Sequence, residues 1–197
     1  MTQPTPYFVT DIEADGQSPY QNSMLSFAAV VLSEVGEVMG EFEAVVKPRP
    51  DRRPDPGTSD WWLTQPEAWA AATADPQDPA EVMPRFAAWV EEFAGRRIFA
   101  ARPWLFDGLW MDCYLDAFAG TRALYVMRHP RPIFMGQGLC IVSYQSAMLG
   151  QTAVGEAANP VPLDWLGDHP HTHRALDDAR GYASLLARLL KMAAGQA

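Results

Sequence analysis

Apolar and polar residues along the chain alternate between short strand-like runs and longer helical periods. Tyr7–Glu13 is a short apolar run that ends in acids and predicts a strand. Met24–Leu32 and Val38–Val46 predict two more strands, joined by a turn at Glu34–Glu37. The later predicted elements are, in chain order, a helix over Ala80–Phe93, a strand over Arg97–Ala101, a helix over Phe106–Phe118, a strand over Leu124–Met127, and helices over Leu139–Leu149 and residues 174–193. This order predicts an α/β fold in which helices cover both faces of a mixed sheet.

Two acidic residues close the first predicted strand. Because side chains on a strand alternate between faces, Asp11 and Glu13 are expected to project together while Ile12 points into the opposite layer. Two neighbouring carboxylates repel each other, and their oxygens suit Mg²⁺ or Mn²⁺. The chain contains 24 acidic residues, so a D-x-E triplet arises easily by chance and is weak evidence for a metal site.

A carboxylate also interrupts the apolar face of the last predicted helix. At 100° per residue, Asp178 falls on the same stripe as Ala175, Tyr182, Leu185 and Leu189. A carboxylate directed toward a core is costly unless it is paired or binds a metal. Two explanations stay open from the pattern alone: a metal ligand, or an ion pair with Arg174 or Arg102.

The order and spacing of three motifs resemble the DEDDh 3′-to-5′ exonucleases, the proofreading-exonuclease-like branch of the ribonuclease H-like superfamily. Asp11 and Glu13 match the first motif, Asp107 in Leu-Phe-Asp-Gly matches the second, and His173 with Asp178 matches the third. The resemblance runs from about residue 7 to 190. It implies a ribonuclease H-like mixed sheet whose first three strands are antiparallel.

The second motif departs from the family pattern. Many relatives carry His-Asn a few residues before the aspartate, where this chain has Arg102-Pro103. Asp107 is therefore the least secure of the four acids, although its place at the start of a predicted helix suits a carboxylate. Asp112 and Asp116 on the same helix are interpreted as solvated surface charges.

The resemblance implies a two-metal phosphodiesterase site. Asp11, Glu13, Asp107 and Asp178 would hold two divalent ions, Mg²⁺ or Mn²⁺, and these would assist an in-line displacement at phosphorus. His173 would act as general base, since an imidazole titrates near neutral pH. All five residues are thus the candidate catalytic set.

Three alternating histidines leave a second interpretation of His173 open. His169, His171 and His173 could bind zinc or nickel. Their spacing around Pro and Thr is poor geometry for a closed site, and no cysteine completes it. His169 and His171 are therefore expected to belong to a surface loop that positions His173.

The net charge of −9 argues against broad capture of duplex nucleic acid, which normally needs many lysines and arginines. A single-stranded 3′ end is the more plausible partner, bound through metal, a few arginines and aromatic stacking. The candidate substrate-binding residues are Trp62, Trp104 and Arg102. Of the adjacent Trp61 and Trp62, at the start of a predicted helix, one is expected to be exposed and could stack on a base, cover a dimer interface, or pack under the preceding loop. A basic segment made up of Arg122, Arg128, His129 and Arg131 could carry a phosphate backbone or be a solvated loop.

The sequence therefore predicts a single exonuclease domain over residues 1–197, with a core from about 7 to 193, acting on single-stranded RNA or short oligonucleotides. A DNA repair or proofreading exonuclease and an inactive relic that binds nucleic acid or a partner are the alternatives. No signal peptide or run of 18 apolar residues is present, which predicts a cytoplasmic protein with no membrane partner and two reduced thiols, Cys113 and Cys140. A homodimer is expected from the resemblance.

Overall fold

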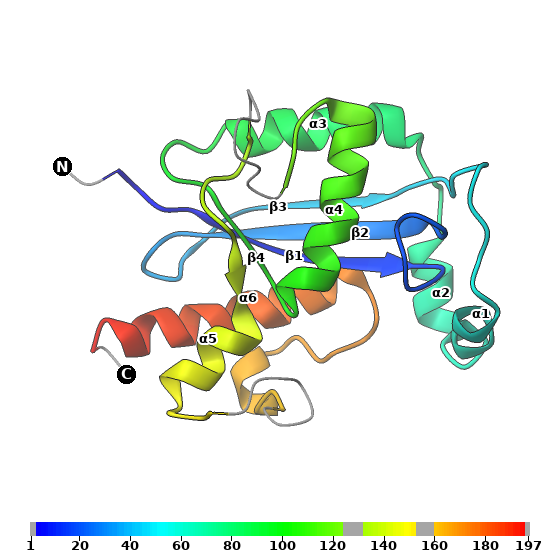
Figure 1. Ribbon diagram of the computed structural model, residues 1–197. Helices are drawn as coiled ribbons and strands as arrows, with labels where there is room; N and C mark the ends of the chain where they lie inside the picture. The colour runs from blue at the N-terminus through cyan, green and yellow to red at the C-terminus, as the bar shows by residue number, and fades with distance from the viewer. Residues whose placement is uncertain (1–2, 124–131, 153–159, 196–197) are drawn as a thin grey trace.

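A mixed sheet of five strands forms the centre of the molecule (Figure 1). The computed structural model describes residues 3–123, 132–152 and 160–195. Its strands are β1 (Tyr7–Ala14), β2 (Met24–Leu32), β3 (Val38–Val45), β4 (Ile98–Ala101) and β5 (Leu139–Cys140), in the spatial order β3-β2-β1-β4-β5. β1, β2 and β3 pair antiparallel, while β4 runs parallel to β1 and β5 parallel to β4. The predicted antiparallel first three strands are confirmed.

Helices cover both faces of this sheet, as predicted. They are α1 (Pro56–Trp62), α2 (Pro66–Ala72), α3 (Pro79–Glu91), α4 (Trp104–Ala119), α5 (Ile141–Met148) and α6 (Ala175–Ala193), with a 3₁₀ turn η1 at Leu163–Leu166. α3 and α4 pack on one face, and α5 and α6 on the other (Figure 1). None of the helices in the described ranges is both long and apolar enough to cross a membrane.

The alternation of β1 divides the core into two layers. Phe8 and Ile12 belong to the layer under α3 and α4, and Val9 belongs to the layer under α6. Phe8 meets the rings of three other aromatic residues edge-on, which is a favoured arrangement for aromatic pairs. Leu185 and Leu189 of α6 are fully buried against the sheet. The face of β1 that carries Asp11 and Glu13 is therefore the face that α6 covers.

Some elements differ from the expectations of the sequence. The predicted helix from Leu139 begins instead with the two residues of β5, because Leu139 pairs with Ala100 in parallel. Two residues are too few to show a strand alternation. α2 was not predicted, and the Trp61–Trp62 pair ends α1 instead of starting it, since the Asp55 side chain caps the helix at Thr58 N. The predicted strand Leu124–Met127 lies outside the described residues.

The interpretation of Asp112 as a solvated charge was wrong. Asp112 is only 3% exposed, and its carboxylate accepts hydrogen bonds from both Nε and Nη2 of Arg122. A buried carboxylate needs such a cationic partner. Asp116, one turn later, is largely exposed as expected, with Arg122 Nη1 at 3.9 Å. Arg122 is therefore held by acidic residues of its own chain, and the other members of the predicted basic segment lie outside the described residues.

Candidate active site

Acidic side chains from three elements meet at the carboxyl end of β1. Asp11 and Glu13 are each 8% exposed and share one face of the strand, while Ile12 points into the opposite layer. Asp178, in the first turn of α6, is 2% exposed. Carboxylate oxygens of Asp11, Glu13 and Asp178 all lie within 4.8 Å of one another. The alternation of the first strand and the apolar stripe of the last helix thus place these three groups as the sequence predicted.

Asp107 reaches the same place from the first turn of α4. Its Oδ1 accepts a hydrogen bond from Ile12 N at 3.2 Å, which fixes the carboxyl group between the two acidic positions of β1. Asp107 is buried, and its position at a helix N-terminus favours negative charge. The unusual Arg102-Pro103 sequence before it has therefore not moved this aspartate away from the other three acids.

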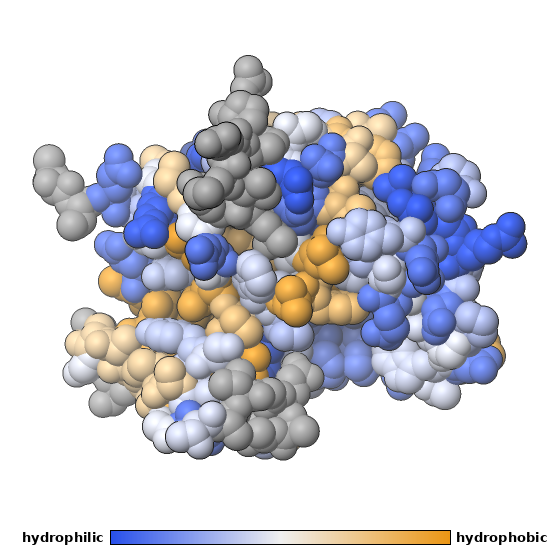
Figure 2. Space-filling model, in the orientation of Figure 1, coloured by the Kyte–Doolittle hydropathy of each residue, from blue (hydrophilic) through white to orange (hydrophobic). Residues whose placement is uncertain are grey.

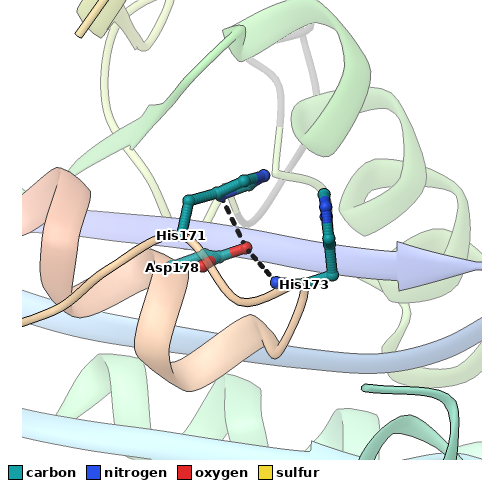
Figure 3. Close-up of side chains that lie close together, drawn as sticks. All are labelled: His171, His173 and Asp178. Carbon is teal, nitrogen blue, oxygen red and sulfur yellow. Dashed lines mark hydrogen bonds and ion pairs between the residues drawn. The ribbon is translucent and has the colours of Figure 1, made fainter. Parts of the chain in front are cut away.

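Asp178 is held by the segment that precedes α6 (Figure 3). Thr172 N donates to Oδ1 at 2.8 Å and His173 N donates to Oδ2 at 3.1 Å. His171 Nδ1 lies 2.9 Å from the same Oδ2. The short side-chain contact of Asp178 is therefore with a histidine, in place of the predicted Arg174 or Arg102.

The pKa of Glu13 is strongly raised in this cluster. Burial, followed by the negative charges of Asp178 and Asp107, raises the pKa of the Glu13 carboxyl from 4.5 to about 9. Glu13 is therefore protonated at neutral pH as long as nothing positive joins the cluster. Oxygen donors that repel each other at this spacing match the preference of hard divalent cations.

His173 stands beside the acids in an uncommon backbone conformation, with φ +56°. Its imidazole lies edge-on to the ring of Trp61, at 4.9 Å between centroids. Burial and the neighbouring His171 lower the pKa of His173, while Asp178 acts in the opposite direction. The net effect keeps the imidazole neutral at neutral pH, which is the form that accepts a proton.

A cleft of about 630 Å³ opens beside His173 and Glu13. Trp61 and Phe106 contribute aromatic rings to its walls, and the loop after β1 contributes Gly16 and Gln17. Figure 2 shows apolar residues gathered over the beginning of α4, where Leu105 is 66% exposed. Glu13 and His173 therefore connect the acidic cluster to a cleft with aromatic walls.

The three predicted substrate-binding residues lie in different surroundings. Trp62 lines the cleft but is only 3% exposed, and its Nε1 donates to Ala14 O at 3.0 Å. Arg102 is buried, with Nη1 donating to Gln145 Oε1 at 2.8 Å. Trp104 is half-buried and packs closely on Gly138. A side chain at position 138 would clash with the indole Nε1 of Trp104. Neither Arg102 nor Trp104 is among the residues that line the cleft.

Three residues near the site are not among the catalytic and substrate-binding residues predicted from the sequence. Trp61, which is 38% exposed, is the solvent-facing member of the tryptophan pair, as helix geometry requires of one of them. Phe106 precedes Asp107 and lines the cleft. His171 contacts Asp178, whereas the sequence favoured a loop role for it over binding of zinc or nickel. The i, i+2 spacing of His171 and His173 was the available signal for that contact.

Comparison with known proteins agrees with this geometry. A ribonuclease H-like sheet with acids at the end of its first strand defines the class of DEDDh-type 3′-to-5′ exonucleases. Residues 7–190 match the model of one family in particular, described as the 3′-5′ exoribonuclease Rv2179c-like domain. The chain belongs to this family, which confirms the resemblance that its three motifs indicate. No curated protein matches the chain.

Solved structures of exonuclease I share the fold. The zinc-bound form of the Escherichia coli enzyme with single-stranded DNA superposes with a TM-score of 0.62 at 17% identity, covering 98% of this chain and 41% of that one. The E. coli enzyme in complex with a dT13 oligonucleotide gives a TM-score of 0.60 at 16% identity, covering 95% and 41%. This chain spans about two fifths of the length of these proteins.

The raised pKa of Glu13 predicts a pH-dependent effect of metal on stability. The pKa of Glu13 is near 4.5 in the unfolded chain and about 9 in the metal-free folded protein. The contribution of Glu13 to the free energy of unfolding is therefore fully present below pH 4.5 and is lost as pH rises toward 9. Cations require the ionised carboxylate, so the rise in Tm on adding Mg²⁺ or Mn²⁺ is expected to grow from about pH 5.5 to about pH 8.5. Thermal melts with and without metal measure it. Glu13→Gln should flatten this trend, and a metal-induced shift independent of pH in the wild type would contradict the assignment.

Proposed function

We propose that this chain removes nucleotides from the 3′ end of single-stranded nucleic acid, with RNA or short oligonucleotides as substrate. One observation carries the proposal: Asp11, Glu13 and Asp178 lie together, Asp107 is hydrogen-bonded to the backbone of β1 between the first two, and Glu13 and His173 line a cleft with aromatic walls. The residues are Asp11, Glu13, Asp107, Asp178 and His173. Their chemistry is that of phosphodiester hydrolysis at a metal centre.

The acidic cluster fits a pair of divalent cations. Its donors are carboxylate oxygens, and when all four groups are ionised their charge equals that of two Mg²⁺ or Mn²⁺ ions. Asp11, Glu13, Asp107 and Asp178 would hold these ions. Such ions supply an activated water at neutral pH and neutralise charge on the attacked phosphate and on the leaving oxygen.

His173 is proposed to take the proton from the attacking water. Its lowered pKa supports a neutral imidazole at working pH. The edge-on contact with Trp61 and the hydrogen bond from its own backbone N–H to Asp178 restrict where the ring can lie. His173 thus positions both its own imidazole, the proposed base, and the carboxylate of Asp178, a proposed metal ligand.

The cleft favours one strand over two. Its volume falls in the range of small-ligand pockets, roughly 300–1,000 Å³, which suits the last nucleotides of a strand. A chain with a net charge of −9 has little general attraction for a duplex backbone. Trp61 and Phe106 offer ring faces on which bases can stack regardless of sequence. The contact with substrate would then rest on stacking and on the metal centre.

RNA is favoured over DNA because the matched family is described as exoribonuclease domains. DNA is the second candidate, because the exonuclease I structures that share this fold include complexes with single-stranded DNA. An inactive binding relic is disfavoured, since all five predicted catalytic residues are present and four of them are acids kept together at an electrostatic cost. The homodimer, the single-domain boundary and the cytoplasmic location stay predictions.

Digestion of matched substrates tests the activity and the preference for sugar. With Mn²⁺ or Mg²⁺ and 5′-labelled single strands of identical sequence, we expect a ladder that shortens from the 3′ end and forms faster on RNA than on DNA. A blocked 3′ end should abolish the ladder. Faster cleavage of DNA would favour the second candidate, and the absence of products from both polymers would leave only the binding relic.

Two variants separate metal binding from proton transfer. Asp11→Asn should abolish the ladder and also the metal-induced rise in Tm, because it removes one of the clustered carboxylates that would hold the ions. His173→Ala should lower kcat by roughly 10²–10⁴-fold while keeping that rise in Tm, since it removes the base and leaves the four acids. Single-turnover rates and thermal melts provide the two readouts. An unchanged kcat in His173→Ala would exclude this residue as the base.

The stacking role of Trp61 has a matched control in the same region. A stacked base contributes about 1–3 kcal/mol, so Trp61→Ala should raise KM at least about fivefold. Trp69 is similarly exposed and contacts Trp62, but it does not line the cleft, so Trp69→Ala should leave KM nearly unchanged. Steady-state kinetics on a short oligonucleotide give both constants. A fall in kcat alone in Trp61→Ala would restrict this residue to orienting His173.

A further inference from the structure

A second histidine stands at the acidic cluster without a part in the proposed reaction. His171 Nδ1 lies 2.9 Å from Asp178 Oδ2, and its ring centroid is 4.3 Å from that of His173 (Figure 3). One ligand atom each from His171, His173 and Asp178 can be chosen so that all three lie within 4.8 Å of one another. These three residues are called the His-His-Asp group below.

The local backbone brings the two histidines to the same carboxylate. Thr172, between them, donates its N–H to Asp178 Oδ1, and His173 donates its N–H to Oδ2. The Thr172 hydroxyl also donates to Asp177 at 3.0 Å. The segment therefore wraps around the start of α6, with one imidazole before and one after the anchoring threonine. This arrangement places Asp178 beside both histidines as a third possible ligand.

The donor atoms of the His-His-Asp group differ from those of the acidic cluster. Asp11, Glu13 and Asp178 offer only oxygen, which suits Mg²⁺ and Mn²⁺. Two imidazole nitrogens with one oxygen suit borderline transition metals such as Zn²⁺, which binds three protein ligands and leaves a position for water. Zinc bonds of about 2.0–2.2 Å require ligand atoms about 3.4 Å apart, a value inside the present spacing of 2.9–4.8 Å. The His171 side chain is 45% exposed, so small adjustments of its ring meet little packing resistance.

We propose that the His-His-Asp group is a second metal site, selective for Zn²⁺ and similar transition metals, and that its occupation stops the Mg²⁺-dependent reaction. The inhibitory consequence rests on the proposed function, because Asp178 belongs to both groups of ligands and His173 is the proposed base. A zinc ion bound here would take the lone pair with which His173 accepts a proton. It would also withdraw Asp178 from the oxygen-only set.

Direct binding measurements test the site without reference to activity. Titration of the metal-free chain with Zn²⁺ alone, followed by calorimetry, is expected to show one site whose Kd rises at least about tenfold in His171→Ala. His169→Ala is the matched control: its residue lines a separate small cavity with Glu41 and Arg180, so the variant should bind like the wild type. Asp11→Asn should also keep the affinity for Zn²⁺, because Asp11 is not in the group. Melting curves confirm that each variant is folded.

The result in these variants decides between the two sets of ligands. Equal affinity in His171→Ala and wild type would overturn the proposal and leave His171 as an ion-pair partner of Asp178. An equal loss in Asp11→Asn and His171→Ala would place zinc among the carboxylates and also overturn it. An equal loss in His169→Ala and His171→Ala would mean general binding by the histidine-rich segment, again against the proposal.

A second measurement tests the inhibition. Each variant is assayed at fixed Mg²⁺ with increasing Zn²⁺, and each rate is normalised to the same variant without Zn²⁺. Half-inhibition is expected to need at least about tenfold more Zn²⁺ in His171→Ala than in wild type or His169→Ala. The same inhibition profile in all three would refute the inhibitory step. If neither the wild type nor any variant cleaves the substrate with Mg²⁺, the proposed function fails. The binding titration still decides whether the metal site exists.

Discussion

The concentration of buried negative charge at the end of β1 is the constraint on which the rest of the molecule depends. Asp11, Glu13, Asp107 and Asp178 are each less than 10% exposed, and burial, followed by the negative charges of Asp178 and Asp107, raises the pKa of Glu13 to about 9. Such a cluster disfavours the folded state unless protons or cations offset its charge. The two apolar layers on either side of the sheet must therefore hold three elements together against it. β1, α4 and α6 meet there because their apolar faces are buried in these two layers.

The parts of this site that follow simple periodicities could be predicted from the sequence. A period of two places Asp11 and Glu13 on one face, and a period of 3.6 places Asp178 on the buried stripe of α6. Both are properties of single elements. Asp107 needed the family resemblance, because its contact with Ile12 N joins residues 95 positions apart and no local pattern encodes it. The order of the strands in the sheet also depends on a long-range contact, the parallel pairing of β1 with β4.

The parts that could not be predicted depend on contacts between elements. The sequence indicated that one of Trp61 and Trp62 is exposed but not which one. The choice is made by the hydrogen bond from Trp62 to Ala14 O, which buries that residue and leaves Trp61 facing His173. Asp112 was misjudged because its partner Arg122 lies in the loop after α4, beyond the helical pattern. Short elements such as β5 and α2 carry too few residues to display a period.

A site that combines carboxylates with a nearby imidazole offers ligands to transition metals as well as to Mg²⁺. The proposed base is an imidazole that is neutral at working pH, and to act it must stand close enough to the carboxylates to reach water beside them. An imidazole near a carboxylate already supplies two of the ligands that transition metals prefer. Affinity for those metals then depends on whether a third donor is within reach. In this chain His171 Nδ1 lies 2.9 Å from Asp178, so the segment that carries the proposed base would also offer transition metals the donors of the proposed second site. Since imidazole nitrogen suits Zn²⁺ better than Mg²⁺, use of Mg²⁺ at the proposed centre would depend on ligand geometry and on the greater availability of Mg²⁺.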